Sequence, residues 1–266
     1  MHRYRTVWIS DTHLGLKEAR TDFLYDFLTT IECDTLYLVG DIIDGWKMQS
    51  GGFRWPDINN DIVKLILEKA SNGTKVVYVP GNHDEMFRDY TDAEVNNIQL
   101  LERATHTTAD GRELLIMHGD EFDYVVMHNK WVAKLGSDLY DFTLMLNRWF
   151  NLLRRKLGLR YWSLSAYLKG RVKEAVKYIG NFEQAVVREA REHGYDGIVC
   201  GHIHHATIAE YEGIEYINCG DWVESCTAIA EHDDGELELI RWVAVSYTHL
   251  RAHETTASIS YAVFCL

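Results

Sequence analysis

Five short segments of the chain combine carboxylate, amide and imidazole side chains with glycine. They are Asp11-Thr12-His13, Gly40-Asp41-Ile42-Ile43-Asp44, Gly81-Asn82-His83-Asp84, His118-Gly119-Asp120 and Gly201-His202-Ile203-His204. Neutral imidazole and carboxylate oxygen suit borderline divalent ions such as Mn, Fe and Zn. The five cysteines show no C-x-x-C spacing, which argues against a thiolate zinc site. We therefore predict a catalytic metal cluster with mixed nitrogen and oxygen ligands.

Such a ligand set is suited to the hydrolysis of phosphate esters. Two divalent cations about 3.5–4 Å apart can clamp a phosphoryl oxygen, activate a water molecule and stabilise an in-line transition state. Each motif alone is a weak signal, because an Asp-x-His turn or a His-Gly pair is common in surface loops. The five motifs together, each placed after an expected strand, favour a two-metal phosphoesterase over five unrelated loops.

The elements that must position these side chains are expected to be strands. Stretches rich in β-branched and aromatic residues predict five of them: Arg5–Ser10, Thr35–Val39, Lys75–Val79, Glu113–Met117 and Gly197–Cys200. Apolar residues at helical spacing predict two intervening helices, one marked by Phe23 to Ile31 and one by Ile62 to Lys69. Alternating strands and helices predict a layered α/β sheet, in which ligands bind beyond the carboxyl ends of the strands.

The middle and the last part of the chain show other patterns. From about residue 125 to 180, apolar residues spaced by three or four predict an inserted helical hairpin. After Cys200, turn signals separate four further expected strands: Thr207–Tyr211, Glu215–Asn218, Cys226–Glu231 and Glu236–Trp242. We therefore expect one domain over residues 1–244 that contains the insertion.

Charge is distributed unevenly. The net charge of −13 argues against a nucleic-acid partner, yet the segment from Phe142 to Lys173 has no acidic residue and eight basic ones. With its aromatic residues, this segment fits contact with an anionic lipid at a membrane surface, and the alternative is a helical hairpin with a solvated charged face. Five arginines are candidate phosphate partners: Arg148, Arg154, Arg155, Arg160 and Arg171.

The ends of the chain add little to the functional prediction. Residues 245–266 resemble the conceptual translation of a sequencing-library adapter, so we treat them as a non-native tail. Neither a signal peptide nor a spanning segment is expected, and the odd number of cysteines predicts reduced thiols. A cytoplasmic location follows as the expectation.

Taken in order, the five motifs resemble the D-x-H, G-D-x-x-D, G-N-H-[DE], H-G and G-H-x-H signature of the calcineurin-like metallophosphoesterase superfamily. The resemblance extends from about Val7 to Trp242. It implies a layered α/β/β/α sandwich with the helical insertion as a cap. It also implies two divalent metal ions, with Mn as the first choice and Fe or Zn as alternatives.

The same resemblance implies roles for individual residues. One metal ion would be held by Asp11, His13 and His204. The other would be held by Asn82, His118 and His202, with Asp41 bridging the two. His83 would protonate or stabilise the leaving oxygen, and Asp44 would orient its ring.

Within the superfamily, the chain is similar to the UDP-2,3-diacylglucosamine pyrophosphohydrolases of lipid A biosynthesis, on the basis of His118-Gly119-Asp120 and the insertion from Val125 to Gly180. This likeness implies cleavage of a nucleotide-linked lipid at the cytoplasmic face of the inner membrane, to give UMP and a lipid monophosphate. Two departures stand against it: His83 replaces an Arg, and His205-Ala206 replaces an Arg-Pro. The alternatives are a phosphodiesterase or phosphatase acting on a nucleotide or phosphoprotein, and an inactive scaffold of the same fold.

Overall fold

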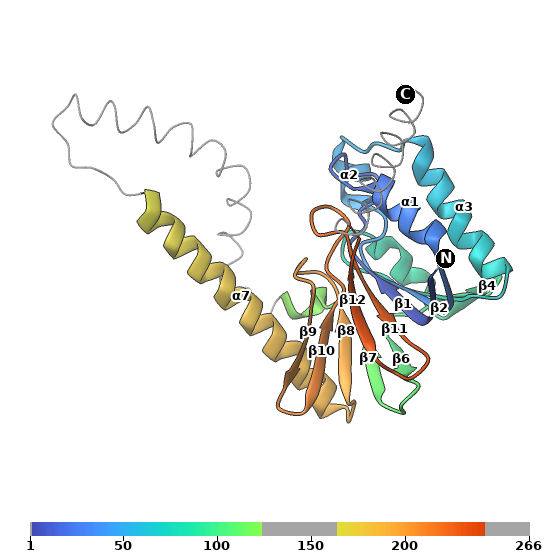
Figure 1. Cartoon of the computed structure of the whole chain (residues 1–266). Coiled ribbons are helices and arrows are strands. Elements are labelled where there is room, and N and C mark those ends of the chain that lie inside the picture. Colours follow the sequence, from blue (N-terminus) through green and yellow to red (C-terminus); the bar gives the residue numbers. More distant parts are fainter. Residues whose placement is uncertain (1, 124–163, 243–266) are drawn as a thin grey trace, which may run out of the picture. The chain divides into compact units, whose positions relative to one another are not determined.

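A computed structural model of the chain describes residues 2–123 and 164–242, without the side chains of residues 164–177 (Figure 1). The chain divides into two compact units, residues 1–120 with 187–266 and residues 121–186. Several predictions fall outside the described residues: most of the hairpin at about 125–180, the tail at 245–266, and the side chains of Arg148, Arg154, Arg155, Arg160 and Arg171.

The first unit contains a seven-stranded sheet with the order β12-β11-β1-β2-β3-β5-β4. Its parallel strands are β1 (His2–Ile9), β2 (Ile31–Val39), β3 (Lys75–Val79) and β5 (Ile98–Leu100). The strands β11 (Thr227–Glu231), β12 (Leu237–Arg241) and β4 (Ala93–Val95) pair antiparallel with their neighbours. Trp8 in β1 lies opposite Tyr37 in β2 and Ile229 in β11, which fixes the register at the centre of the sheet.

A five-stranded sheet of the same unit has the order β6-β7-β8-β10-β9. The strands β7 (Glu113–Ile116), β8 (Gly197–Cys200) and β10 (Ile214–Asn218) are parallel. The edge strands β6 (Ala104–Thr107) and β9 (Thr207–Tyr211) are antiparallel to them. Three parallel strands of this sheet and three of the first therefore end in loops that carry the motifs or lie next to them.

Side chains that alternate along the strands build two hydrophobic cores. Val7 and Ile9 of β1 face a core shared with the helices α1 (Thr21–Thr30) and α3 (Asp57–Ser71), which pack against each other. Trp8 faces the other core, which contains Leu114 of β7 and Val199 of β8. This period of two is what a strand buried on both faces requires. The predicted α/β architecture with two packed sheets is confirmed.

Two features differ from the prediction. Ile31 is not the last residue of a helical stripe, because α1 ends at Thr30 and Ile31 is already extended (φ −104°, ψ 149°) as the first residue of β2. Its side chain is still buried in the same core. The strands β4, β5 and β6 were not predicted, since three or four residues are too few to show a clear alternation.

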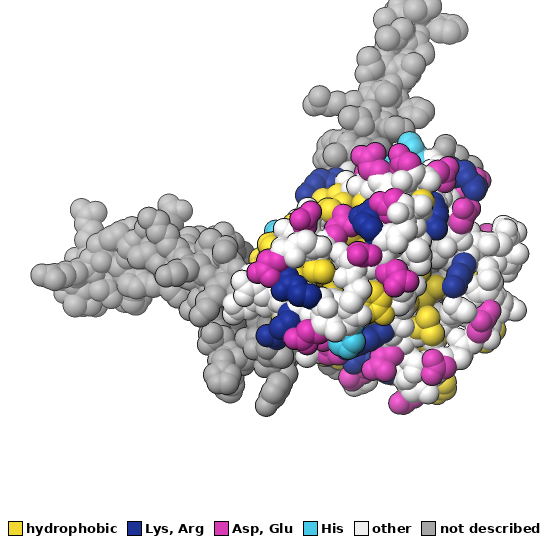
Figure 2. Space-filling view, turned by 90° about the horizontal axis from the view of Figure 1, so that it is seen from below, with side chains coloured by type: hydrophobic (Ala, Val, Ile, Leu, Met, Phe, Trp, Pro, Cys, Tyr) yellow, Lys and Arg dark blue, Asp and Glu magenta, His cyan; other side chains and the backbone are white. Residues whose placement is uncertain are grey.

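The remaining described elements are short or belong partly to the second unit. They are α2 (Gly45–Ser50), the 3₁₀ helices η1 (Glu85–Tyr90) and η2 (Asp120–Phe122), and α7 (Leu164–Glu192). None of the helices within 2–123 and 164–242 has the length and apolar character needed to cross a membrane. Acidic and basic side chains are intermixed on the face of the molecule shown in Figure 2.

A buried carboxylate joins the two sheets away from the motif loops. The side chain of Glu231 is 0% exposed and lies 2.8 Å from His106 Nε2 and 2.5 Å from Arg5 Nη1, and it accepts a hydrogen bond from the backbone of Ala109. Burial would raise the pKa of Glu231, but the hydrogen bonds from His106, Ala109 and Thr6 lower it to about 2. The folded protein therefore holds this group ionised.

We expect Glu231→Gln to destabilise the protein at pH 7 by about 3 kcal/mol, the equivalent of a pKa shift from 4.5 to about 2. Because the folded-state pKa is depressed, this contribution is present above pH 4.5 and is lost as the pH falls toward 2. Urea unfolding at pH 7 and pH 3 measures it, with exposed Glu236→Gln as the control. An equal difference between wild type and variant at both pH values would contradict the assignment.

Candidate metal centre

The predicted motif residues come together at the carboxyl ends of strands from both sheets. Three overlapping sets of side chains have potential ligand atoms within 4.8 Å of one another: Asp11, His13 and His204; His13, Asp41 and His83; and Asp41, His118 and His202. The loops after β1, β2 and β3 meet the loops after β7 and β8 there. Residues almost 200 positions apart thus share one site.

The first set surrounds the carboxylate of Asp11. His204 Nε2 lies 3.1 Å from Asp11 Oδ1 and 3.4 Å from His13 Nε2. His13 Nε2 in turn lies 3.9 Å from both Asp11 Oδ1 and Asp41 Oδ2. The rings of His13 and His204 therefore face the same space between two buried carboxylates.

The third set contains Asp41 together with His118 and His202. His118 Nε2 is 3.3 Å from Asp41 Oδ2, and the rings of His118 and His202 are 5.2 Å apart at 73°. Asp41 is the one carboxylate of the third set and lies near His13 of the first set. This position between the two sets is the one that a bridging ligand would need.

The tautomer of His118 is fixed by the backbone. Its Nδ1 lies 3.0 Å from the carbonyl oxygen of Val39, and since a carbonyl can only accept, Nδ1 must carry the proton. In the neutral ring, Nε2 then presents its lone pair toward Asp41. A protein-held imidazole with its second nitrogen anchored in this way is the usual arrangement of a metal ligand.

Buried acceptor atoms without partners test whether cations fit this site. Asp11 Oδ1, Asn82 Oδ1 and His118 Nε2 are buried and have no hydrogen-bond partner among the described residues. Leaving such atoms unpaired costs about 1–3 kcal/mol each. All three carry lone pairs, so bound cations would satisfy them, and the residues present fit a pair of divalent ions.

The backbone at these positions is unusual. Asp11, His13, Asp41, His202 and His204 all have φ between 46° and 70°, in the left-handed region. Non-glycine residues seldom adopt this region, and the strain persists only where the surroundings impose it. Five such residues in one cluster indicate that the loops are shaped to direct side chains into the site.

Asp84 holds two motif loops together, a role that the sequence did not reveal. Its buried carboxylate accepts hydrogen bonds from the backbone N–H groups of Ile42 (2.7 Å) and Gly81 (2.6 Å) and from the hydroxyl of Tyr78 (2.5 Å). The one sequence feature that pointed to a role for Asp84 was its position as the last residue of the G-N-H-[DE] motif. The loop carrying Asp41 is thereby fixed to the loop carrying Asn82 and His83.

His83 lies beside the cluster in contact with Asp44. Its Nδ1 is 3.3 Å from Asp44 Oδ1, and Asp44 Oδ2 is 3.6 Å from His13 Nδ1, so one carboxylate serves two rings. Burial lowers the pKa of His83, but the carboxylates of Asp44 and Asp41 outweigh it and raise the pKa above its usual value. Cations bound at Asp41 would oppose that part of the effect and leave Asp44 as the anion beside the ring.

Further polar contacts support the loops from outside the cluster. Arg88 in η1 donates hydrogen bonds to both carboxylate oxygens of Asp120 at 2.8 Å, so the two side chains form an ion pair. Asp221 accepts the N–H groups of Val223 and Glu224 in a turn after β10. Asp120 and Asp221 thus stabilise loops near the cluster.

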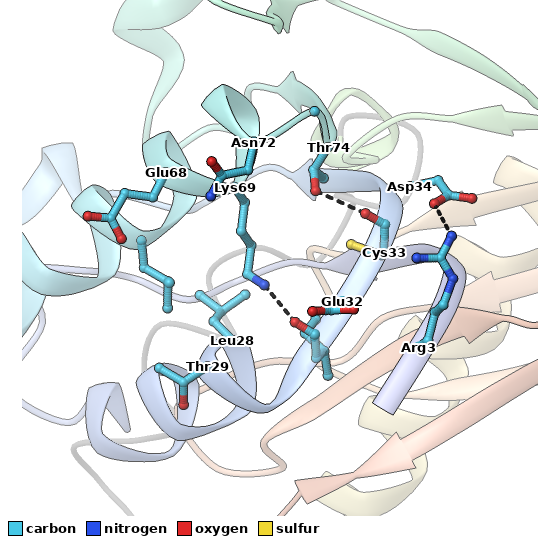
Figure 3. A pocket seen from close by; sticks show the side chains of 13 residues that line it. Arg3, Leu28, Thr29, Glu32, Cys33, Asp34, Glu68, Lys69, Asn72 and Thr74 are labelled. Atoms are coloured by element: carbon cyan, nitrogen blue, oxygen red, sulfur yellow. Dashed lines mark hydrogen bonds and ion pairs between the residues drawn. The ribbon is translucent and has the colours of Figure 1, made fainter. Parts of the chain in front are cut away.

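A separate groove lies away from the motif loops. A groove of about 740 Å³ is lined by residues from the beginnings of β1 and β2 and from α1 and α3 (Figure 3). Both of its basic groups are engaged: Arg3 pairs with Asp34 at 2.8 Å, and Lys69 donates to the carbonyl of Ile31 at 2.6 Å. The motif loops follow the opposite ends of these strands, so this groove is not the candidate metal centre.

We expect Asp84→Ala to destabilise the protein by about 3 kcal/mol and to weaken metal binding, because buried N–H groups of two motif loops lose their acceptor. Urea unfolding and the metal content after dialysis measure these effects. Asp89→Ala is the matched control, since Asp89 is exposed in the 3₁₀ helix that directly follows Asp84 and should shift stability by less than about 0.5 kcal/mol. Wild-type metal content in Asp84→Ala would contradict the role of Asp84.

Gly81→Ala tests how tightly the loops pack. A Cβ at this position would lie 2.3 Å from Asp41 Oδ1 and 2.7 Å from His118 Nε2. We expect at least a tenfold, order-of-magnitude loss of metal affinity by titration calorimetry, the effect of displaced ligands. Gly180→Ala in α7 meets no atom within 4 Å and should leave metal affinity unchanged. Equal metal affinity in Gly81→Ala and Gly180→Ala would contradict this expectation, because the site would then tolerate displacement of its ligands.

Comparison with known proteins places the chain in a family. Proteins named UDP-2,3-diacylglucosamine hydrolase from Psychromonas ingrahamii and Haemophilus influenzae are 27% and 26% identical to it, over 86% and 89% of this chain and 94% and 98% of theirs. A solved dimetal phosphatase from Danio rerio matches 90% of this chain and 99% of its own, with 12% identity and a TM-score of 0.43. The calcineurin-like phosphoesterase profile matches residues 4–206. The chain therefore belongs to the calcineurin-like phosphoesterase family and is a metal-dependent hydrolase.

Proposed function

We propose that the protein hydrolyses the pyrophosphate of UDP-2,3-diacylglucosamine to UMP and a lipid monophosphate. The observation that carries the proposal is the convergence of carboxylates and imidazoles around Asp41. Such ligands can hold the cations that promote hydrolysis of a phosphoester bond. The substrate is inferred from relatives that bear this name over nearly their whole length. The order of the motifs and the His118-Gly119-Asp120 segment support the same substrate.

In this proposal, seven residues hold two cations. Asp11, His13 and His204 bind one, Asn82, His118 and His202 bind the other, and Asp41 bridges them. Mn is the proposed metal, with Fe and Zn as alternatives, because imidazole and oxygen ligands suit all three. When bound, the cations polarise the phosphoryl group and lower the pKa of a water molecule.

His83 and Asp44 complete the site on the side of the leaving group. The imidazole of His83 donates a proton or a hydrogen bond to the departing oxygen, and the nearby carboxylate of Asp44 stabilises the protonated ring. The shared contact of Asp44 with His13 links the leaving-group side to the metal side. A single buried carboxylate thus keeps both imidazoles in place.

We also propose that the basic segment between Phe142 and Lys173 takes part in substrate binding. Arg148, Arg154, Arg155, Arg160 and Arg171 are the candidates to pair with the pyrophosphate, and the neighbouring aromatic residues would contact acyl chains. The protein would then work at the cytoplasmic face of the inner membrane. The charge and composition of the segment are the basis for this part of the proposal.

The test is to incubate the Mn-loaded protein with UDP-2,3-diacylglucosamine in detergent and to measure UMP. We expect turnover by wild type and by the exposed control Asp89→Ala, and at least a hundredfold, order-of-magnitude loss in Asp41→Ala because both cations lose a ligand. Circular dichroism checks that Asp41→Ala is folded. If wild type and Asp41→Ala were equally inert with excess Mn²⁺ on lipid and soluble esters, an inactive scaffold of the same fold would be favoured.

A phosphodiesterase or phosphatase acting on a nucleotide or phosphoprotein is the second candidate, and His83 is the observation that favours it. An alkoxide leaving group needs a proton, whereas a phosphate leaving group is stable as an anion near neutral pH. A histidine beside a carboxylate suits the former, and the arginine typical of the lipid-specific branch suits the latter.

His83→Arg separates these two candidates. If the pyrophosphate is the substrate, the variant should keep UMP release within about tenfold of wild type, because a positive charge still faces the departing phosphate. If an alkyl phosphodiester is the substrate, the variant should lose about a hundredfold or more in kcat, the typical contribution of a general acid. Preference of wild type for a small soluble diester over the lipid pyrophosphate would overturn the lipid assignment.

A further inference from the structure

Three consecutive residues at the start of α2 contact His83 in three different ways. The carboxylate of Asp44 lies 3.3 Å from Nδ1, and the backbone N–H of Gly45 donates to the carbonyl oxygen of His83 at 2.9 Å. The indole of Trp46 stacks on the imidazole, with ring centroids 4.0 Å apart and planes inclined by 27°. One short segment thus contacts the edge, the backbone and the face of the same residue.

Trp46 is not a core side chain. It is 47% exposed and belongs to neither hydrophobic core of the first unit. An indole normally contributes most by burying its large apolar area, so a half-exposed position gains little stability from burial. Its described ring contact is with His83.

The other ring neighbour of His83 is His13, which meets it edge to face at 4.6 Å and 85°. The imidazole therefore lies between an indole plane and a second ring. The carboxylate of Asp44 lies 3.3 Å from Nδ1, but Nδ1 makes no hydrogen bond with the described residues, so this contact alone does not fix the plane of the ring. A planar stack fixes this plane, since tilting the imidazole would separate the two faces.

We propose that Trp46 is a positioning residue that fixes the plane of the His83 ring, so that Nε2 points in one direction toward the departing oxygen. The inference deepens the proposed function and rests on its assignment of His83 to the leaving group. Proton transfer requires the donor within hydrogen-bond reach and in line, so a ring that swings loses transfer efficiency without loss of substrate binding. Trp46 acts through His83 and has no direct part in the bond cleavage.

Leaving-group dependence and a double-mutant cycle provide the kinetic test. Trp46→Leu, which keeps apolar bulk without a ring, should lower kcat on phenyl phosphodiesters about tenfold, part of the contribution of a general acid. The kcat on p-nitrophenyl diesters, whose leaving group needs little protonation, and the KM on both should stay within about twofold by the same reasoning. Trp46→Phe should restore most of the loss. In a His83→Ala background, Trp46→Leu should have no further effect, because the two side chains act as one unit.

Met48→Ala is the control for general disturbance of α2, since Met48 is exposed in the same helix. It should match wild type on both esters. Equal losses on phenyl and p-nitrophenyl esters in Trp46→Leu, or a loss that persists in His83→Ala, would overturn the proposal in favour of a merely structural role.

An NMR measurement on the Zn-loaded protein tests the stack independently of turnover. The imidazole Cε1–H signal of His83, identified by its disappearance in His83→Ala, should be shifted upfield by the indole ring current and should move downfield in Trp46→Leu. An unchanged signal would overturn the proposal even if the enzyme were active. Conversely, an intact stack in a protein that hydrolyses neither these esters nor UDP-2,3-diacylglucosamine would refute the proposed function, and with it the positioning role.

Discussion

The structure depends on the burial of two like-charged carboxylates, Asp11 and Asp41, at the place where two sheets meet. Each is almost inaccessible to solvent, and His13 Nε2 lies 3.9 Å from an oxygen of both. Burying a charge without a partner is expensive, and two charges of one sign also repel each other. The imidazoles around them offset part of this cost, and the unpaired acceptor atoms of Asp11, Asn82 and His118 indicate where positive charge is still required.

That requirement explains features of the backbone that would be costly elsewhere. Left-handed conformations at five motif residues aim their side chains at one point, and Gly81 and Gly201 bring backbone so close that a Cβ would lie within 2.4 Å of Asp41 or Asp11. Asp84 then joins the loop of Asp41 to that of Asn82 by accepting backbone hydrogen bonds from both. Strain, close packing and polar support together keep the ligands from moving apart.

In the proposed function, the residues that would bind the metal ions differ from those that would stabilise the leaving group. The metal ligands would face the phosphoryl group and His83 the leaving oxygen, and the carboxylate of Asp44 lies close to both His83 and His13. In this proposal, a substitution at position 83 would change how the departing oxygen is stabilised and would leave the metal ligands in place. Trp46, as proposed, would fix the orientation of the His83 ring.

The sequence by itself determined the local elements and the types of residues at their ends. The five motif-bearing strands were identified from β-branched and aromatic runs because their carboxyl-terminal halves are mostly buried, and their loops were found from the unusual density of Asp, Asn, His and Gly. The family also follows from the sequence alone, since the order of the motifs does not depend on coordinates.

Only the tertiary structure decided which side chains touch. Asp84 and Trp46 have ordinary local contexts, and their roles arise from contacts with loops or rings brought near by the parallel pairing of β1, β2 and β3. The short strands β4 to β6 are likewise defined by pairing with neighbouring strands, and Ile31 by its pairing with His2 in β1. Spacing along a chain records periodicity, whereas hydrogen bonds, stacking and charge burial depend on distances in space that the fold alone supplies.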